Sequence, residues 1–265
     1  MLKVVVTGAD GRMGREVVKA VLGEEDIELV GAVDRNNQGQ DIGTLAVGRS
    51  CGVPVTGNLG RVLEETGAHV VVDFTTPANI RENIAIMLQH KVNAVIGTTG
   101  LSGDDIAEID REALEAGVGV LIAPNFAIGA VLMMKFAAEA ARYLPHVEII
   151  ELHHDRKLDA PSGTAVKTAE LIKTQRESFR QGHPEEHEKF SGVRGGDFDG
   201  MRVHSIRLPG LVAHQEVIFG GLGQTLRIKH DSISRESFMP GVILAVRKVT
   251  ELKGVTYGLE KLLTE

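Results

Sequence analysis

Residues 2–7, Leu2-Lys3-Val4-Val5-Val6-Thr7, run directly into the glycine-rich sequence Gly8-Ala9-Asp10-Gly11-Arg12-Met13-Gly14. The apolar, largely β-branched first part is typical of a strand that is buried on both faces of a parallel sheet. Beyond the glycines, apolar residues recur at helical spacing, at Met13, Val17, Ala20 and Val21. We therefore predict a strand, a tight turn and a helix at the start of the chain.

The glycine-rich turn has the spacing Gly-x-x-Gly-x-x-Gly rather than the strict Gly-x-Gly-x-x-Gly of dinucleotide-binding folds. Glycine lets the backbone approach a pyrophosphate, which the free N–H groups at the start of the next helix can bind. Arg12 could add a cation, whereas the Asp10 carboxylate would repel a phosphate unless it caps the helix. A plain structural turn is the alternative. The predicted cofactor-binding residues here are Gly8, Ala9, Asp10, Gly11, Arg12 and Met13.

The second predicted strand, residues 27–33, ends at Asp34-Arg35. In a dinucleotide-binding fold, an acidic residue at this place accepts a hydrogen bond from the ribose 2′-hydroxyl and favours NADH. An arginine beside it can stack on adenine or pair with a 2′-phosphate, which favours NADPH. Both residues are predicted to bind the cofactor, and the sequence leaves the choice between NADH and NADPH open. An exposed charged turn is the alternative.

Strands and helices continue to alternate up to residue 126. Further strands are predicted at 70–74, 93–96 and 119–123, and the intervening helices at 80–88 and 106–116. This alternation predicts an α/β unit with a parallel sheet and helices on both faces. Ligands bind along the carboxyl edge of such sheets. Two turns there are predicted to hold the nicotinamide carboxamide, at Gly97, Thr98 and Thr99 and at Ala123, Pro124, Asn125 and Phe126.

The pattern changes after Phe126. We predict helices over 128–143, 164–174 and 240–250, strands over 147–152, 203–208, 216–219 and 225–229, and a long loop over 175–201. This indicates a second, α+β domain with a mostly antiparallel or mixed sheet. The predicted domains are therefore residues 1–126, with 236–265 packing back on them, for dinucleotide binding, and residues 127–235 for substrate binding and oligomerisation.

Composition excludes several functional classes. The formal net charge is −7 and aromatic residues make up 4% of the 265 residues, so a nucleic-acid-binding surface is not expected. No apolar run approaches the ~20 residues of a membrane span. The chain enters its first strand at once, which leaves no signal peptide and suggests the cytoplasm. One cysteine, Cys51, can form neither an internal disulfide nor a zinc site, and we expect no metal.

The densest chemical signal is the segment from Glu151 to Ala165, Glu-Leu-His-His-Asp-Arg-Lys-Leu-Asp-Ala-Pro-Ser-Gly-Thr-Ala. A strand ends in His153 and His154, Lys157 follows, and Pro-Ser-Gly-Thr opens a helix. The first N–H groups of that helix and the Thr164 hydroxyl can bind a carboxylate. Histidine is the usual proton carrier near neutral pH, and Lys157 adds positive charge. A helix cap beside a solvated charged loop is the alternative.

This segment resembles the signature of the dihydrodipicolinate reductase family, Glu-x-His-His-x-x-Lys-x-Asp-Ala-Pro-Ser-Gly-Thr-Ala, at every fixed position. Further stretches resemble the family in order and spacing, at residues 11–15, 73–75, 97–100 and 125–126. The resemblance spans nearly the whole chain. It implies a Rossmann-type cofactor domain, a mixed-sheet substrate domain and a homotetramer. It also implies that NADH or NADPH reduces a small cyclic dicarboxylate in lysine and diaminopimelate biosynthesis.

The same resemblance implies residue roles. His153 is expected to be the general acid and Lys157 the assisting donor, while His154, Gly163 and Thr164 bind the substrate carboxylates. The sequence departs from the family at Asp34, where many relatives carry glutamate. Two other functions stay open as alternatives, another NAD(P)-dependent dehydrogenase of aspartate-family metabolites and a non-catalytic nucleotide sensor.

Overall fold

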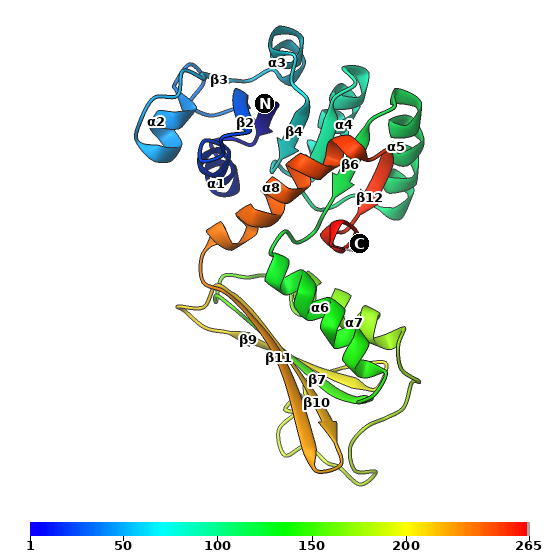
Figure 1. The fold of residues 1–265 in the computed structure, drawn as a ribbon. Coiled ribbons are helices and arrows are strands. Elements are labelled where there is room, and N and C mark those ends of the chain that lie inside the picture. Colours follow the sequence, from blue (N-terminus) through cyan, green and yellow to red (C-terminus); the bar gives the residue numbers. More distant parts are fainter. Residues whose placement is uncertain (264–265) are drawn as a thin grey trace. The chain divides into compact units, whose positions relative to one another are not determined.

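The computed structural model describes residues 1–263 and divides into two compact units (Figure 1). Unit 1 contains Met1–Phe126 and the C-terminal segment that starts at Phe238, and unit 2 contains Ala127–Ser237. These limits lie close to the predicted domain boundaries. Residues 264–265 of the predicted C-terminal segment lie outside the described residues. No described helix is both long and apolar enough to cross a membrane.

Unit 1 is built on a seven-stranded parallel sheet with the strand order β12-β6-β5-β4-β1-β2-β3. The strands are β1 (Leu2–Thr7), β2 (Ile27–Val33), β3 (Val55–Thr56), β4 (Val70–Asp73), β5 (Asn93–Ile96), β6 (Gly119–Ile122) and β12 (Gly254–Tyr257). The order reverses between β1 and β4, which opens a crevice at their carboxyl ends. The predicted Rossmann-type parallel sheet is confirmed.

Helices cover both faces of this sheet. They are α1 (Arg12–Val21), α2 (Ile42–Val47), α3 (Leu59–Thr66), α4 (Ile80–Gln89), α5 (Gly103–Ala116) and α8 (Met239–Lys248). Helices α3, α4 and α5 share one core with Val5 and Val71 of the sheet. Helices α1 and α8 contact each other, and they pack on β1 and β5 respectively. The two all-valine stretches, in β1 and β4, are therefore buried on both sides.

The end of unit 1 differs from the sequence prediction. We expect the helix at 240–250 to close the chain, and this prediction is wrong because β12 follows it and pairs with β6. The strand is only four residues long and lies at the sheet edge, so it lacks the apolar run of a buried strand. A backbone N–H of Val255 also donates to Asp110 Oδ1 (2.7 Å), a tertiary contact that the local sequence does not encode.

Unit 2 is built on a five-stranded sheet with the order β11-β10-β7-β9-β8. The strands are β7 (His146–His153), β8 (Gly196–Phe198), β9 (Met201–Arg207), β10 (Ala213–Gly221) and β11 (Gln224–Ser232). Strands β7 and β9 are parallel and the other pairs are antiparallel, so the predicted mixed sheet is confirmed. Along β7, Val147, Ile149 and Glu151 are the buried members of the alternation.

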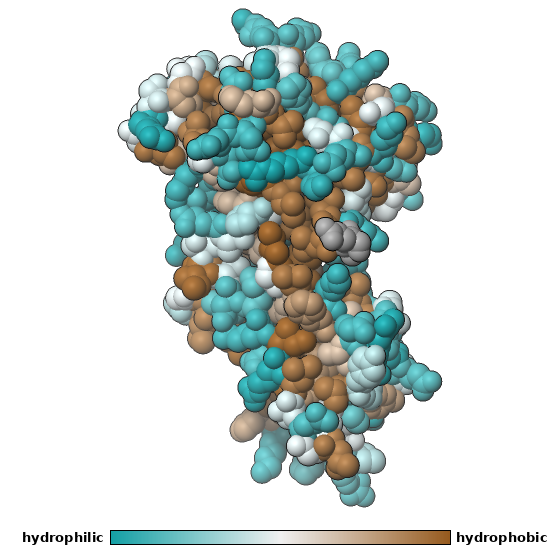
Figure 2. All heavy atoms as spheres, in the orientation of Figure 1, coloured by the Kyte–Doolittle hydropathy of each residue, from teal (hydrophilic) through white to brown (hydrophobic). Residues whose placement is uncertain are grey.

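Helices α6 (Ile128–Ala141) and α7 (Gly163–Lys173) contact each other and pack on this sheet. Figure 2 shows apolar residues along much of the visible face of α6. Phe136 of this helix is 53% exposed. The predicted loop over 175–201 is wrong at its end, because Gly196–Phe198 forms β8 and pairs with the start of β9. The turn between them has positive φ angles at Asp199 and Gly200. This short hairpin lies within a glycine-rich stretch that the sequence predicts to be a loop.

Candidate active site

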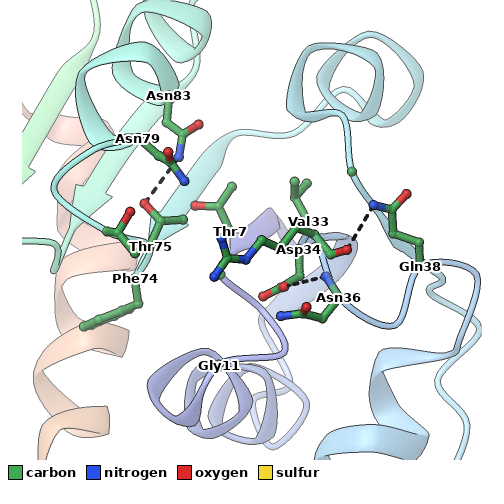
Figure 3. Close-up of a pocket in the computed structure, with 14 residues that line it drawn as sticks. Thr7, Gly11, Val33, Asp34, Asn36, Gln38, Phe74, Thr75, Asn79 and Asn83 are labelled. Atoms are coloured by element: carbon green, nitrogen blue, oxygen red, sulfur yellow. Dashed lines mark hydrogen bonds between the residues drawn. The ribbon is translucent and has the colours of Figure 1, made fainter.

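A cavity of about 400 Å³ lies in unit 1 where the strand order reverses. Figure 3 shows residues from the ends of three strands around it: Thr7 at the end of β1, Asp34 after β2 and Thr75 after β4. The cavity is lined by Thr7, Gly8, Gly11, Val33, Asp34, Arg35, Asn36, Gln38, Gly57, Phe74, Thr75, Thr76, Asn79 and Asn83. The structure thus brings four of the residues predicted to bind cofactor, Gly8, Gly11, Asp34 and Arg35, to one cavity.

The glycine turn is shaped by two close backbone approaches. Gly8 has φ +69°, and a Cβ there would lie 2.5 Å from the Phe74 carbonyl oxygen. A Cβ on Gly14 would lie 2.0 Å from the Gly8 carbonyl oxygen. Gly11 is the N-cap of α1 and its N–H donates to Gly8 O (3.0 Å). Helix α1 therefore begins directly on the turn, with its first N–H groups at the cavity.

The Asp10 side chain does not cap α1, so the repulsion between its carboxylate and a phosphate must be relieved in another way. Its carboxylate accepts hydrogen bonds from Arg15 Nη2 (2.7 Å) and from Asn37 Nδ2 (2.8 Å). Arg15 thus neutralises the charge that would repel a phosphate. The backbone N–H of Asp10 donates to Asp34 Oδ2 (3.1 Å), and Asn36 N donates to Asp34 Oδ1 (2.9 Å). The turn and the end of β2 are therefore held together through Asp34.

A buried carboxylate that received no role from the sequence, Asp73, joins three strand ends. Its exposure is 0%. It accepts hydrogen bonds from the Thr7 hydroxyl (2.7 Å), the Thr98 hydroxyl (2.7 Å) and Asn83 Nδ2 (2.8 Å). Thr75 adds its backbone N–H (3.0 Å) and its hydroxyl (2.8 Å). Through Asp73, the ends of β1, β4 and β5 and the start of α4 are fixed relative to each other.

Asp73→Asn is expected to lower the free energy of unfolding of the first urea transition by about 3 kcal/mol, because an amide NH₂ would face donors that need an acceptor. Asp104→Asn, at an exposed position in the first turn of α5, is the control and is expected to cost less than about 1 kcal/mol. Equal urea midpoints for the two variants would show that the buried carboxylate does not organise this edge.

The other two predicted cofactor turns lie at the same sheet edge. Thr98 is 7% exposed and is held by Asp73, while Gly97 lies against the Phe74 ring, where a Cβ would come within 2.1 Å. Phe126 is 2% exposed, and its ring centroid lies 5.8 Å from that of Phe74. Phe74 therefore links the turn at 97–99 with the turn at 123–126.

In unit 2, His153 ends β7 with its side chain 15% exposed. Its Nδ1 bonds to Glu151 Oε2, and Glu151 is fully buried. Burial raises the pKa of Glu151, but hydrogen bonds from His153, Arg207 and Ser205 outweigh it and lower this pKa to about 2. Because the carboxylate is ionised, Nδ1 must be the donor. Nε2 is then the nitrogen that takes up a proton to form the imidazolium and can give it up again.

Lys157 and the start of α7 follow in the same segment. Lys157 Nζ lies 2.7 Å from Asp159 Oδ1, and its side chain is 21% exposed. Ser162 caps α7 by accepting a hydrogen bond from Ala165 N (3.2 Å), so Gly163 and Thr164 occupy the first turn. His154 is exposed. This confirms a helix start immediately after the His–Lys segment, with its positive dipole end beside it.

Sequence reasoning missed the buried partners of these residues. Glu151 was visible in the motif, but only the register, in which Glu151 lies opposite Ser205 and His153 opposite Arg207, reveals the ion pair with Arg207. Lys229, one of the residues without a predicted role, pairs with Asp231 (2.9 Å). No group of three His, Cys, Asp or Glu residues suited to a metal ion occurs within residues 1–263.

Comparison with known proteins assigns the chain. The family profile described as "Dihydrodipicolinate reductase, N-terminus" matches residues 2–126, and the one described as "Dihydrodipicolinate reductase, C-terminus" matches residues 129–263. The chain belongs to the dihydrodipicolinate reductase family. The predicted family is therefore confirmed.

Individual relatives agree over the full length. The 4-hydroxy-tetrahydrodipicolinate reductase of Desulfitobacterium hafniense is 56% identical over 99% of this chain and 98% of that protein. The enzyme of the same name from Halalkalibacterium halodurans is 54% identical over 99% of this chain and 100% of that protein. A solved structure, a dipicolinate-bound dihydrodipicolinate reductase from Paenisporosarcina sp. TG-14, is 46% identical with a TM-score of 0.89, covering 98% of this chain and 99% of that chain.

The chain is accordingly an oxidoreductase of the dihydrodipicolinate reductase family, which uses a reduced nicotinamide nucleotide and acts in lysine and diaminopimelate biosynthesis. This decides between the predicted reductase and its two alternatives.

Proposed function

We propose that unit 1 binds NADPH or NADH and that unit 2 binds a small cyclic dicarboxylate, with His153 as the proton donor. The observation that carries this proposal is the bond from His153 Nδ1 to the buried Glu151 carboxylate, at the end of a strand and next to a helix start. This bond fixes the ring with Nδ1 protonated and stabilises the imidazolium form, in which Nε2 carries the proton to be donated.

The residues that line the cavity of unit 1 support dinucleotide binding. The close approach of Gly14 to Gly8 leaves no space for side chains where a pyrophosphate would meet the first N–H groups of α1. The Asp34 carboxylate lines the cavity and would accept a bond from a ribose hydroxyl, with Arg35 beside it. Proposed cofactor-binding residues are Gly8, Ala9, Asp10, Gly11, Arg12, Met13, Asp34, Arg35, Gly97, Thr98, Thr99, Ala123, Pro124, Asn125 and Phe126.

When bound, the reduced nicotinamide supplies a hydride. Hydride addition to a conjugated imine leaves electron density on the substrate that a proton must meet, and His153 provides that proton from Nε2. The substrate carboxylates require N–H donors and cations. The N–H groups of Gly163 and Thr164 at the start of α7, together with His154 and Lys157, supply them.

Lys157→Ala is expected to raise the substrate KM about 10- to 100-fold, because it removes a charged donor to a carboxylate worth ~1.5–3 kcal/mol. Turnover is expected to fall as well if Lys157 assists proton transfer. The measurement is the loss of reduced-nicotinamide absorbance at varied substrate concentration. Lys253→Ala, at an exposed position before β12, is the control. Wild-type kinetics for Lys157→Ala would remove this residue from the site.

We further propose that four copies assemble through the sheet face of unit 2 that lies opposite α6 and α7. On β7 this face presents Ile150 and Leu152, which alternate with the buried Ile149 and Glu151 and are only partly exposed. Ile218 of β10 lies on the same face, opposite Glu148 of β7. Sedimentation is expected to give about four times the chain mass of 28.5 kDa, and a monomer would contradict the assembly. The proposed location is the cytoplasm.

A further inference from the structure

Within residues 1–263, only Asp73 and Glu151 are carboxylate residues with 0% exposure. Asp73 organises the sheet edge of unit 1. Glu151 lies in unit 2, inside the His–Lys segment. The sequence analysis gives it no role, and the proposed function uses only its bond to His153. Burying a carboxylate costs free energy unless its oxygens are fully paired, so the partners of Glu151 indicate its role.

Both oxygens of Glu151 are engaged by three different elements. Oε2 accepts from His153 Nδ1 and from Arg207 Nη1 (2.9 Å), and Oε1 accepts from Arg207 Nη2 (2.7 Å) and from the backbone N–H of Ser162 (3.2 Å). Arg207 on β9 thus forms a two-pronged ion pair with Glu151 on β7. The Ser162 contact attaches the N-cap of α7 to the same carboxylate.

Arg207 extends this set of contacts to Lys157. Its Nη2 also donates to the backbone carbonyl of Asp159 (2.8 Å), and the Asp159 carboxylate holds Lys157 Nζ at 2.7 and 2.9 Å. One buried ion pair therefore fixes the ring of His153, the loop that carries Lys157 and the first turn of α7. These are the three groups to which the proposed function assigns the proton and the substrate carboxylates.

We propose that Glu151 and Arg207 form a positioning pair for the reaction, which holds His153 in the Nδ1-protonated state and fixes Lys157 and the start of α7 around the substrate. This inference rests on the proposed function of His153. Neither residue of the pair needs to touch the substrate. The carboxylate stabilises the imidazolium that donates the proton, and the guanidinium keeps the carboxylate ionised within the protein.

Charged groups from three elements surround the ring of His153. Glu151 is the negative group in contact with the ring, Arg207 contributes a positive charge from β9, and Lys157 and Asp159 contribute a paired charge from the loop. On β10 the residue opposite Glu151 is the neutral Gln215, and His230 of β11 lies opposite Gln215. Removing the Glu151 charge therefore leaves His153 beside an unbalanced Arg207.

Glu151→Gln is the decisive substitution. The glutamine oxygen is expected to stay with Arg207 and Ser162, so its NH₂ group faces His153 Nδ1 and disfavours the proton there. We expect kcat to fall at least about 100-fold, because loss of the equivalent carboxylate–imidazole bond in serine proteases costs about 10⁴-fold. We also expect the neutral ring of His153, followed by NMR of its two nitrogens, to change from the Nδ1-protonated to the Nε2-protonated tautomer. The His153 signal is the one that His153→Ala lacks.

Glu148→Gln is the matched control. Glu148 lies on the same strand and also pairs with an arginine and a histidine, Arg194 (2.7 Å) and His204 (2.8 Å), but it contacts none of the groups above. We expect its kcat and the tautomer of His153 to stay as in the wild type. Arg207→Lys is a milder second variant, because lysine keeps the charge but cannot bridge Glu151 and Asp159. We expect it to lower kcat about 10-fold or more and to raise KM.

The results separate this inference from the proposed function. If Glu151→Gln keeps the wild-type kcat and the wild-type tautomer of His153, the positioning pair is refuted while His153 can still be the acid. A fall in kcat without any change in the His153 tautomer would show that Glu151 is merely structural, and would also refute it. If His153→Ala keeps wild-type turnover, the proposed acid is wrong whatever Glu151 does. Should Glu151→Gln fail to fold, unchanged kcat and KM in Arg207→Lys would overturn the pair.

Discussion

His153→Ala is expected to lower kcat by roughly 10²–10⁴-fold, the range that a general acid contributes. The reason is local. His153 is the residue of unit 2 whose ring is fixed through Nδ1 by a buried carboxylate at the end of β7, which leaves Nε2 to deliver the proton. Alanine removes the donor and leaves the strand and the α7 cap in place. The affinity for NADPH is expected to stay near wild type, because the cofactor is proposed to bind in unit 1.

The measurement is the kcat of the variant together with its NADPH dissociation constant from fluorescence titration. His187→Ala, at an exposed position in the segment between α7 and β8, removes a histidine without touching the site and is expected to behave as wild type. An outcome in which His153→Ala abolishes NADPH binding, while turnover per bound cofactor stays unchanged, would make the assigned role wrong.

The second large effect is expected from Gly14→Ala. The added Cβ would lie 2.0 Å from the Gly8 carbonyl oxygen and 2.8 Å from the Ala9 Cα, both backbone atoms that cannot rotate away. Helix α1 must then move off the turn, and the first N–H groups of α1 leave the positions in which they can bind a pyrophosphate. We expect the NADPH dissociation constant to rise at least about 100-fold, the loss of two or more charge-assisted hydrogen bonds.

Gly103→Ala is the matched control for this prediction. Gly103 is also in the first turn of a helix, α5, but a Cβ there meets nothing within 4 Å. Its NADPH affinity is expected to equal that of wild type, and its stability to be equal or slightly higher, since alanine is the better helix former. If Gly14→Ala binds NADPH as tightly as Gly103→Ala, the turn over residues 8–14 is not the phosphate site.

The parts of the fold that could be predicted are those that local pattern determines. The valines of β1 and β4 predict strands buried on both faces, and the glycine turn predicts the helix that follows. Tertiary contacts decide the rest. Strand β12 exists because it pairs with β6, and β8 exists because Phe198 pairs with Met201 across a turn with positive φ angles. Neither carries an apolar alternation of its own.

The candidate site shows the same division. His153, Lys157 and the α7 start lie together in the sequence, so their motif alone places them together. The residues that support them are not close in the sequence, because Arg207 is brought to Glu151 only by the parallel pairing of β7 with β9. In unit 1, Asp73 adjoins a recognisable motif, yet its role depends on Thr7 and Thr98, 66 and 25 residues away in the chain. A single sequence does not reveal such partners.

The claim that His153 delivers the proton is tested most directly by a single turnover. Enzyme saturated with NADPH is mixed rapidly with substrate, and the decay of reduced-nicotinamide absorbance is followed in wild type and in His153→Ala. The account predicts the same amplitude of bound NADPH in both proteins and a decay roughly 10²–10⁴-fold slower in the variant. Decay at the wild-type rate in His153→Ala would contradict it.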